Sequence, residues 1–452
     1  MPDVDQADLQ GNILCGYGNS FAHVLHAFLR VDDAAAGRGL IGELAGEVTT
    51  AVPWAEKPLE TLNVATSHCG LRALGVRGDV LDRFPEEFRA GMAAHADVLG
   101  DVDDSAPERW QDTLRPGGLH LLVTMAARTD PARDAAAKRL RERLPPGVAV
   151  AHEEPAGVLL EIRHDEVVRE HFGFADGLSQ PTIDDPRAGP RDQEGRGTPT
   201  KDDAWDDIAP GEFVLGYPDE DGLVASDPPD PLRRNGSFMV VRKLHQAVGP
   251  FESYLRETAS ALDLSEEYLA AKMVGRWRSG APLSLSPDRD DPELTPTGER
   301  KGELNAFRYG SDGDGSRCPL GAHIRRANPR DALGWHGVLT KRHRVIRRGM
   351  PYGPAYDGRE ADRGLMFVCY QASIARQFEF IQSLWLNDGD PFGLGSDRDP
   401  LANGVPSRKM TIQGRRPRFL ASLSSFVTTR GGDYFFAPGI EAMRALGAGE
   451  VS

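Results

Sequence analysis

The sequence predicts an α+β protein made of two similar halves, with antiparallel sheets flanked by helices and covered by long loops. Strand-like segments alternate with helical segments twice before residue 152, and the alternation resumes after residue 236. This order favours a sheet with helices packed against it. Two stretches rich in Asp, Pro and Gly, 184–235 and 279–316, interrupt the pattern. Because loops of this length are usually functional, they are expected to cover a site.

The first half contains two strand–helix–strand cycles. The predicted elements are strand 21–31, helix 37–47, strand 61–66, strand 118–126, helix 131–144 and strand 147–152. Apolar residues fill the first strand (FAHVLHAFLRV), whereas polar and apolar residues alternate in TLNVAT. The Pro145-Pro146 pair ends the second helix. Before these cycles, residues 8–14 (DLQGNIL) form a short mixed stretch with a turn at Gly11.

The second half repeats the theme with more irregular segments between its elements. The predicted elements are strand 237–242, helices 251–261 and 265–275, strand 342–347, strand 365–371, helix 373–386, strand 433–437 and a short final helix. Ser265 is a suitable N-cap for the second of these helices. In helix 373–386 the apolar residues fall on one face. We therefore expect two domains, residues 1–200 and 201–452.

Composition limits the possible partners and locations of the chain. The 452 residues carry a formal net charge of −15, which argues against a general binder of nucleic acids or of anionic membranes. The four cysteines are far apart and form no Cys-x-x-Cys pair, as expected for a reduced setting. No apolar run approaches the ~20 residues needed to span a bilayer. A cytoplasmic protein is the resulting expectation.

Residues 318–330 (CPLGAHIRRANPR) place His323 beside small residues and just before two arginines. The small neighbours leave room for a flat, bulky ligand, and arginine forks suit its carboxylates. Haem meets both requirements, with imidazole on iron and arginine on the propionates. Arg325 and Arg326 are both candidates for the propionates, but adjacent side chains diverge, so only one is expected to contact them. A histidine with a purely structural role is the alternative.

A second motif, residues 171–181 (HFGFADGLSQP), sets Asp176 among aromatic and apolar residues. Glycines at 173 and 177 keep the backbone thin around it. Burial would raise the pKa of this carboxyl and a nearby arginine would lower it, so it could serve as an acid–base group. An ordinary Asp-Gly turn is the alternative.

A third motif, residues 343–353 (HRVIRRGMPYG), carries several arginines on a predicted strand. Alternation along a strand sends Arg347 to one face and Arg348 to the other. An arginine just before Gly349 could point into a pocket, although clustered arginines more often form a solvated edge. Residues 312–316 (DGDGS) hint at a calcium loop, but Arg317 occupies its sixth position, which argues against one.

Together these motifs resemble the dye-decolourising peroxidases, a haem peroxidase family, over essentially the whole chain. The matching segments are 8–14 (DLQGNIL), 173–177 (GFADG), 322–326 (AHIRR) with 328–330 (NPR), 347–349 (RRG) and 431–436 (GGDYFF). The length is similar to that of the larger intracellular bacterial members. The resemblance implies two ferredoxin-like domains, with one haem b per chain held mainly by the C-terminal domain.

The resemblance also implies a role for individual residues. His323 would be the proximal ligand of the haem iron, Asp176 the distal acid–base residue and Arg347 the distal arginine, with Arg344 as the competing choice. The expected haem-binding residues are His323, Arg326, Asn328, Leu365, Phe367 and Asp399. Leu365 and Phe367 resemble the apolar pair of the distal pocket, with strand core as the alternative. Asp399 matches less securely the carboxylate that accepts a hydrogen bond from the ligand histidine.

The expected activity is the oxidation of dyes, phenols or similar one-electron donors by hydrogen peroxide. Bulky donors would pass electrons through aromatic residues, for which Trp277, Tyr370, Trp385 and Tyr434 are available, although core packing is the alternative for each. A different class of function on the same fold is a haem-binding or iron-handling protein, such as a deferrochelatase. Such a protein would need His323 but neither Asp176 nor Arg347. A homo-oligomer is possible in either case.

Overall fold

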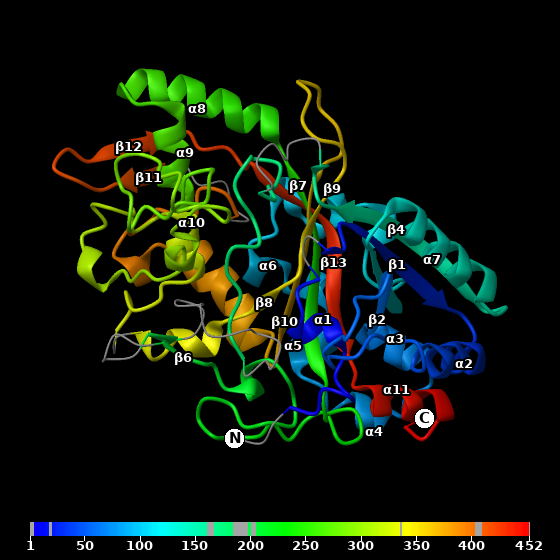
Figure 1. Ribbon diagram of the computed structural model, residues 1–452. Coiled ribbons are helices and arrows are strands. Elements are labelled where there is room, and N and C mark those ends of the chain that lie inside the picture. Colours follow the sequence, from blue (N-terminus) through cyan, green and yellow to red (C-terminus); the bar gives the residue numbers. More distant parts are fainter. Residues whose placement is uncertain are drawn as a thin grey trace.

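The computed structural model describes residues 4–17, 20–160, 167–183, 198–199, 205–334, 337–402 and 409–451. A nine-stranded sheet, with strand order β4-β1-β3-β2-β13-β7-β10-β8 and β9 beside β10, runs through this part of the chain. Its neighbouring strands pair antiparallel. In Figure 1, α10 lies to the left of β7, β10 and β13, and α2 and α7 lie to their right. In this view the strands lie between α10 on one side and α2 and α7 on the other, and α11 lies near α2.

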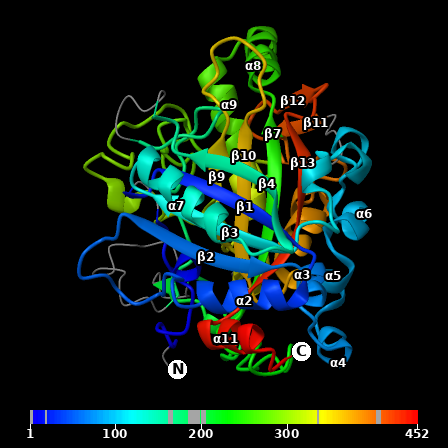
Figure 2. The same ribbon diagram turned by 90° about the vertical axis from the view of Figure 1, so that its right-hand side faces the viewer.

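The first four strands and two helices form the N-terminal half. They are β1 (His23–Val31), α2 (Ala34–Leu44), β2 (Glu60–Thr66), β3 (Leu121–Ala127), α7 (Asp130–Arg143) and β4 (Val148–Gly157). The strand order β4-β1-β3-β2 with two crossing helices is the ferredoxin-like arrangement. Figure 2 shows α7 and α2 in front of these strands. Asp33 caps α2 by accepting a hydrogen bond from Ala36 N, and Thr129 caps α7 in the same way through Ala132 N.

The C-terminal half repeats this arrangement. Its elements are β7 (Ser237–Gln246), α8 (Val248–Leu262), β8 (Ile346–Arg347), β9 (Met350–Tyr352), β10 (Gly364–Gln371), the π-helical segments η12 (Ala375–Glu379) and η13 (Ile381–Leu386), and β13 (Val427–Ala437). The order β13-β7-β10-β8 again places the last strand beside the first. Only the pair Phe436 and Thr66 joins β13 to β2, so the sheet consists of two nearly separate halves. The expected domain boundary at residues 200–201 lies outside the described residues.

Further short elements surround the sheet. The helices are α1 (Gly11–Leu14), α3 (His68–Ala73), α4 (Gly78–Leu81), α5 (Glu86–Ala90), α6 (Ala96–Leu99), α9 (Glu266–Val274), α10 (His323–Ala327) and α11 (Ile440–Ala448). The minor strand pairs are β5 (Thr198–Pro199) with β6 (Trp205–Asp206), and β11 (Lys409–Ile412) with β12 (Arg418–Ala421). Within the described ranges, none of the helices combines the length and apolar character needed to cross a membrane.

Most of the predicted elements are confirmed, and two of them differ in kind. The predicted strand 342–347 is wrong over most of its length, because Thr340–His343 is a 3₁₀ turn and only Ile346–Arg347 pairs with β10. The His343 ring stacks on Phe380 with ring centroids 3.7 Å apart, which holds this segment off the sheet. The predicted helix 373–386 exists and buries Ile374, Phe378, Ile381 and Trp385, but its turns are π-helical. Ser265 caps α9 as expected.

Candidate functional site

His323 begins the short helix α10, directly after the loop that α9 leads into. Its Nδ1 lies 2.9 Å from Oδ2 of Asp399, and the His323 side chain is 29% exposed whereas that of Asp399 is fully buried. The hydrogen bond at Nδ1 leaves Nε2 as the ring nitrogen for a metal. Burial lowers the pKa of His323, but the charge and hydrogen bond of Asp399 raise it by more, so the net pKa lies above its ordinary value. The imidazole is therefore both oriented and basic.

Asp399 is itself held from two sides. Its Oδ1 accepts hydrogen bonds from Leu401 N at 2.9 Å and Ala402 N at 2.7 Å, and Oδ2 faces His323. Burial raises the pKa of Asp399, but His323 and these amides outweigh that effect and lower it. Asp399, which the sequence matched less securely, is thus an ionised carboxylate hydrogen-bonded to His323.

The Asp176 loop is fixed by main-chain hydrogen bonds at its base. Asp176 N donates to Val168 O at 2.8 Å, and Ala175 N donates to Arg278 O at 3.0 Å. Gly173 and Gly177 have φ angles of 87° and 70°, a region that costs other residues more. The Asp176 side chain is exposed. The buried rings that neighbour it in sequence, Phe172 and Phe174, pack into the cluster formed with α8 and α9.

Glu170, which the sequence motifs did not single out, anchors this loop. Its carboxylate accepts hydrogen bonds from Phe172 N and Phe174 N, both at 3.0 Å, and from Gln246 Nε2 at 2.6 Å. Burial raises the pKa of Glu170, and the charge of Asp176 raises it further, although the hydrogen bonds oppose the shift. Glu170 thereby fixes the backbone at Phe172 and at Phe174, which lies two residues before Asp176. A carboxylate three residues before a Gly-Phe pair carries no local signal of this role.

Arg347 ends β8 and reaches back to the segment that follows Asp176. Its Nη2 donates to Ser179 O at 2.6 Å, and its main-chain N donates to Gln180 Oε1 at 2.9 Å. The Arg347 side chain is exposed, yet burial by the surrounding protein lowers its pKa and the charge of Asp176 partly restores it.

Arg348 confirms the predicted alternation. Its guanidinium donates to Asn12 O and Ile13 O in the N-terminal segment, away from Ser179. Arg347, Asp176 and His323 form one electrostatic neighbourhood, because Asp176 raises the pKa of Arg347 and the charge of Arg347 opposes protonation of His323. The structure therefore brings together the histidine, the carboxylate and the arginine that lie far apart in sequence.

Leu365 and Phe367 lie on the same face of β10 as Cys369, which pairs with Arg347. Both are only partly buried, whereas Met366, on the opposite face, is fully buried. Phe367 also packs against Phe378, with ring centroids 5.9 Å apart. Phe367 is thus the next residue on this face after Cys369, the partner of Arg347, while Leu365 pairs with Pro351 further along β10, and both keep part of their surface uncovered.

Arg325 and Arg326 are both engaged by the protein. Arg325 binds Asp312 Oδ2 at 2.8 Å and thereby closes the loop that resembled a calcium site. Arg326, which is fully buried, donates to the carbonyls of Trp385, Asp388 and Asp397. The propionate contact predicted for Arg326 stays a prediction that these contacts do not support, because its Nη atoms already hold the end of η13.

Other arginines make a better anion site. Arg330 donates to the carbonyls of Asn305 and Phe307, and burial lowers its pKa to about 10. Burial also lowers the pKa of Arg344 to about 9, and the charges of Arg330 and Arg347 add to this shift. Several positive charges are thus crowded into one interior region, which favours an anionic ligand. Arg330 was within the sequence motif and is buried like Arg326, but its charge acts on Arg344, whereas Arg326 is surrounded by the carboxylates of Asp388, Asp397 and Asp399.

Asn328 caps the end of α10, and its Oδ1 is a buried acceptor with no hydrogen-bond partner among the described residues. An unsatisfied buried oxygen of this kind needs an explanation such as a ligand or an ordered water. Its position between His323 and Arg330 places it at the same interior region. Groups of three or more His, Cys, Asp or Glu side chains suited to a metal ion do not occur among the described residues.

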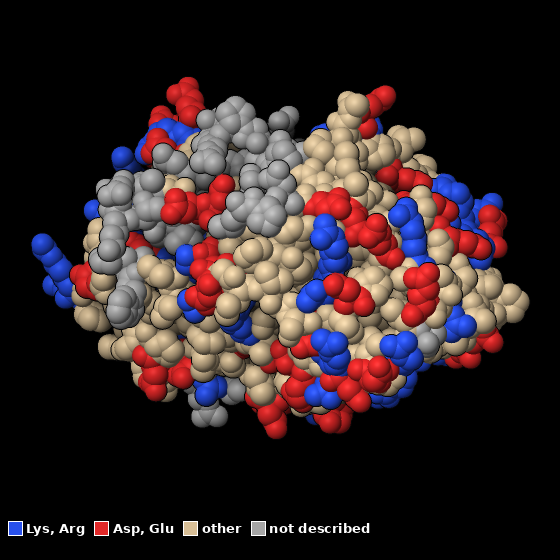
Figure 3. Space-filling model, turned by 90° about the horizontal axis from the view of Figure 1, so that it is seen from below, with Lys and Arg blue, Asp and Glu red and all other residues tan. Residues whose placement is uncertain are grey.

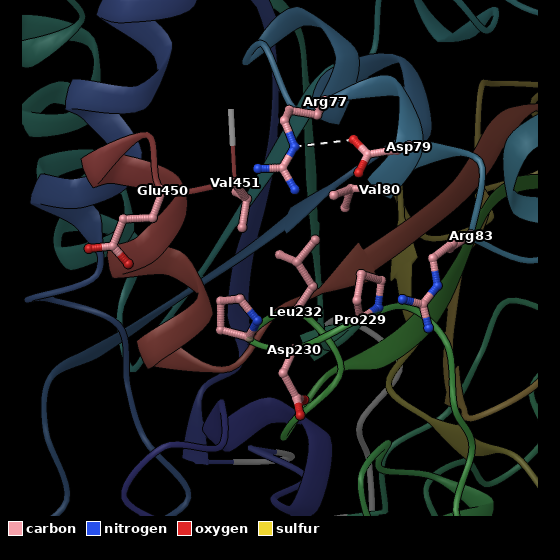
Figure 4. A pocket seen from close by; sticks show the side chains of 10 residues that line it. Arg77, Asp79, Val80, Arg83, Pro229, Asp230, Leu232, Glu450 and Val451 are labelled. Atoms are coloured by element: carbon pink, nitrogen blue, oxygen red, sulfur yellow. Dashed lines mark hydrogen bonds and ion pairs between the residues drawn. The ribbon is translucent and has the colours of Figure 1, made fainter.

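A separate surface pocket of about 190 Å³ lies between α4, the turn at 229–232 and residues 450–451 (Figure 4). Its arginines are paired, Arg77 with Asp79 and Arg83 with Asp227. None of the predicted site residues lines this pocket. Basic and acidic side chains are interspersed on the face seen in Figure 3, so that face offers no broad region of one sign.

Comparison with known proteins identifies the family. A model described as the DyP dimeric alpha+beta barrel domain matches residues 8–157, and one described as Dyp-type peroxidase, C-terminal, matches residues 219–392. Dye-decolorizing peroxidase msp1 from Mycetinis scorodonius is 30% identical over 472 residues, covering 97% of this chain and 87% of that protein. The chain belongs to the dye-decolourising peroxidase family.

Other relatives agree with this assignment. The multifunctional dye peroxidase DyP2 from an Amycolatopsis species is 31% identical over 97% of this chain and 95% of its own length. The crystal structure of a fungal DyP-type peroxidase from Auricularia auricula-judae superposes with a TM-score of 0.84, at 27% identity, over 99% of this chain and 100% of that one. A deferrochelatase from Yersinia pestis is 36% identical over only 23% of this chain and 19% of its own length.

As a dye-decolourising peroxidase, the chain is a haem-dependent enzyme. The residues present fit that cofactor. His323 offers a basic, oriented imidazole, and the crowded arginines suit propionates. The two α+β halves likewise fit the fold of this family.

Proposed function

We propose that the chain reduces hydrogen peroxide and oxidises dyes, phenols or similar one-electron donors, with His323 holding the haem iron and Asp176 and Arg347 assisting cleavage of the O–O bond. The observation that best supports this proposal is the contact between the Asp176 motif and the Arg347 motif. Arg347 Nη2 donates a hydrogen bond to Ser179 O at 2.6 Å, and the charge of Asp176 raises the pKa of Arg347. A haem-binding protein alone would have no need of such a pair.

Haem, when bound, supplies the iron that takes up peroxide and accepts its oxidising equivalents. Asp399 keeps the His323 ring oriented through Nδ1 and presents Nε2 to the site. Asp176 is a carboxylate that can take a proton from peroxide and return it to the leaving oxygen. Arg347 places a positive charge where negative charge develops as the O–O bond breaks. Leu365 and Phe367 keep the nearby surface apolar, which restricts water and bulky donors.

We assign the propionate contacts to Arg330 rather than Arg326. Both arginines donate to carbonyls of the chain, but Arg330 lies in the crowded cationic region, whereas the charge of Arg326 is offset by the nearby carboxylates of Asp388, Asp397 and Asp399. Arg344 contributes to the same positive region and is the competing choice for the distal arginine. One haem b per chain, a cytoplasmic location and a possible homo-oligomer complete the proposal.

The test compares two adjacent arginines. Haem-loaded wild-type protein, Arg347→Leu and Arg348→Leu are mixed with hydrogen peroxide, and the haem absorption band is followed. We expect all three to keep the resting haem spectrum, and Arg347→Leu alone to react slower by about 10²- to 10³-fold, the usual cost of losing one charge-stabilising donor. Circular dichroism checks that Arg348→Leu remains folded, because its guanidinium binds two N-terminal carbonyls.

Two outcomes would contradict parts of this proposal. If Arg347→Leu reacts at the wild-type rate, Arg344 becomes the distal arginine and the same experiment is repeated on Arg344→Leu. If the wild-type protein binds haem but shows no spectral change with peroxide, the haem-handling alternative is favoured. The local likeness to a deferrochelatase is the observation behind that alternative. Release of iron-free porphyrin, followed by fluorescence, would then be the activity to measure.

A further inference from the structure

A series of polar side chains outside the proposed site leads from Tyr434 through Glu379 of η12 to His95. Tyr434 on β13 is 1% exposed, and its hydroxyl donates to Glu379 Oε1 at 2.7 Å. His95 Nδ1 lies 2.9 Å from the same oxygen. His95 Nε2 lies 3.1 Å from Glu86 Oε2, whose side chain is 65% exposed. A series of close contacts therefore leads from the buried phenol to the surface.

Aromatic rings connect the same phenol to the proposed site. Phe367, beside Arg347, lies 5.9 Å from Phe378, and Phe378 lies 6.4 Å from Tyr434, measured between ring centroids. Phe378 and Glu379 are consecutive residues of the π-helical segment η12, and such widened turns often occur at functional sites. One turn of η12 thus places the Phe378 ring in contact with Phe367 and the Glu379 carboxylate within hydrogen-bond distance of the Tyr434 hydroxyl.

This pairing has a chemical consequence for the phenol. Burial raises the pKa of Tyr434 well above its ordinary value, and the charge of Glu379 raises it further, so the phenol keeps its proton in the resting protein. A neutral phenol loses an electron easily only if its proton leaves at the same time. Burial raises the pKa of Glu379 too, partly offset by Tyr434 and His95, which makes its carboxylate a better proton acceptor than an exposed one.

We propose that Tyr434 is an internal one-electron donor to the peroxidase site, with Glu379 as the acceptor of its phenolic proton. The inference rests on the proposed peroxidase function, which supplies hydrogen peroxide as the oxidant. Reduction of one peroxide to two waters needs two electrons and two protons. Tyr434 gives one of these electrons by way of Phe378 and Phe367, and its own proton moves to Glu379 Oε1. The external one-electron donors of the proposed reaction supply the other electron, and solvent supplies the two protons that form water. A further external electron then reduces the Tyr434 radical, and Glu379 returns the phenolic proton.

Other buried tyrosines lack this combination. The Tyr370 hydroxyl accepts a hydrogen bond from Asn12 Nδ2 at 2.6 Å, which does not provide a proton acceptor. Tyr352 donates to Asp362 at 3.1 Å, but the Lys243 ammonium lies 4.5 Å from the centre of its ring and opposes the loss of an electron. Arg242, 5.7 Å from the Phe378 ring centre, is paired with Asp101, which offsets its charge. Tyr370→Phe is therefore a matched control.

The experiment mixes haem-loaded protein with hydrogen peroxide in the absence of any donor, freezes the mixture within milliseconds to seconds, and records electron paramagnetic resonance spectra. We expect a tyrosyl signal that narrows when the tyrosine rings are deuterated. Tyr434→Phe should lose this signal while it keeps the haem spectrum and the rate at which the haem band first responds to peroxide. Tyr370→Phe should keep the signal. Glu379→Gln, which can still bond the phenol but cannot take its proton, should also lose it.

The outcomes separate this inference from the proposed function. A tyrosyl signal that persists in Tyr434→Phe, or a haem band that responds to peroxide with no tyrosyl signal in wild-type protein, overturns the role of Tyr434 and leaves the peroxidase function standing. A haem band that does not respond to peroxide overturns both. Because Tyr434→Phe keeps the ring and removes only the hydroxyl, its effect is not one of lost core packing.

Discussion

The imidazole of His323 and the carboxylate of Asp399 meet with 2.9 Å between Nδ1 and Oδ2, although 76 residues separate them in sequence. The carboxylate is fully buried, and its second oxygen is satisfied by two main-chain amides. This arrangement leaves the carboxylate little freedom to turn away from the ring. The orientation of the proposed iron ligand is therefore set by a loop from the far end of the C-terminal half.

The first prediction concerns that contact. Asp399→Asn keeps the size of the side chain but removes the charge that makes His323 basic, so we expect haem affinity or peroxide reactivity to fall by about 10- to 100-fold. The reduction potential of the iron should rise, because a less basic ligand stabilises the oxidised metal less. Haem titration and spectroelectrochemistry measure the two effects. An unchanged potential would show that Asp399 only supports its own loop.

The second prediction concerns Asp176. Asp176→Asn can still accept the hydrogen bond from Gly177 N, so the loop should keep its shape, but the amide cannot take a proton. We expect the resting haem spectrum to persist and the reaction with peroxide to slow by about 10²- to 10⁴-fold, the range for a lost acid–base group. Stopped-flow absorption gives the rate. A wild-type rate would mean that Arg347 suffices for cleavage.

The third prediction distinguishes two arginines of one motif. Arg330→Gln removes a charge from the crowded cationic region, and we expect haem affinity to fall by about tenfold or more, the effect of losing one hydrogen bond to a charged group. Arg326→Gln should keep haem affinity. Both variants should lower the free energy of unfolding, because Arg326 holds three carbonyls and Arg330 holds two, so haem affinity is the readout that distinguishes them. Haem titration and thermal unfolding of both variants provide the comparison. The opposite pattern would restore Arg326 as the propionate ligand.

The fourth prediction concerns stability and pH. Glu212 is fully buried beside Arg376, with 2.8 Å between Oε2 and Nη2, and burial raises the pKa of its carboxyl from 4.5 to about 7. Since the folded state holds this proton more tightly than the unfolded state, the stabilisation is fully present below pH 4.5 and is lost as the pH rises through about 7. A shift of this size corresponds to on the order of 3 kcal/mol.

Glu212→Gln tests that prediction, because glutamine has no proton to lose in this range. The free energy of unfolding, measured with denaturant from pH 4 to 8, should decline with rising pH more steeply in wild-type protein than in the variant. Parallel curves for the two proteins would show that Arg376 already holds Glu212 in its charged form across the range.

Much of the fold could be predicted from local patterns. Apolar runs and turn residues located the long strands of the sheet, because each strand has to bury one or both faces wherever it lies. The short strand β8 and the π-helical turns could not be predicted in this way. His343 stacks on Phe380, and Glu379 N bonds to Ile374 O five residues back, and both contacts exist only once β10 and the following helix have packed together.

The sequence by itself determined the chemical groups of the candidate site, because the order of Asp176, His323 and Arg347 within their motifs identifies the family. Only the tertiary structure decided how these groups are used. It separated Arg330 from Arg326 by their charged neighbours, brought Asp399 to His323, and revealed Glu170 and the Tyr434–Glu379 pair. The physical reason is that pKa values, desolvation and hydrogen bonds depend on residues that are distant in sequence. These residues come into contact only in the folded protein.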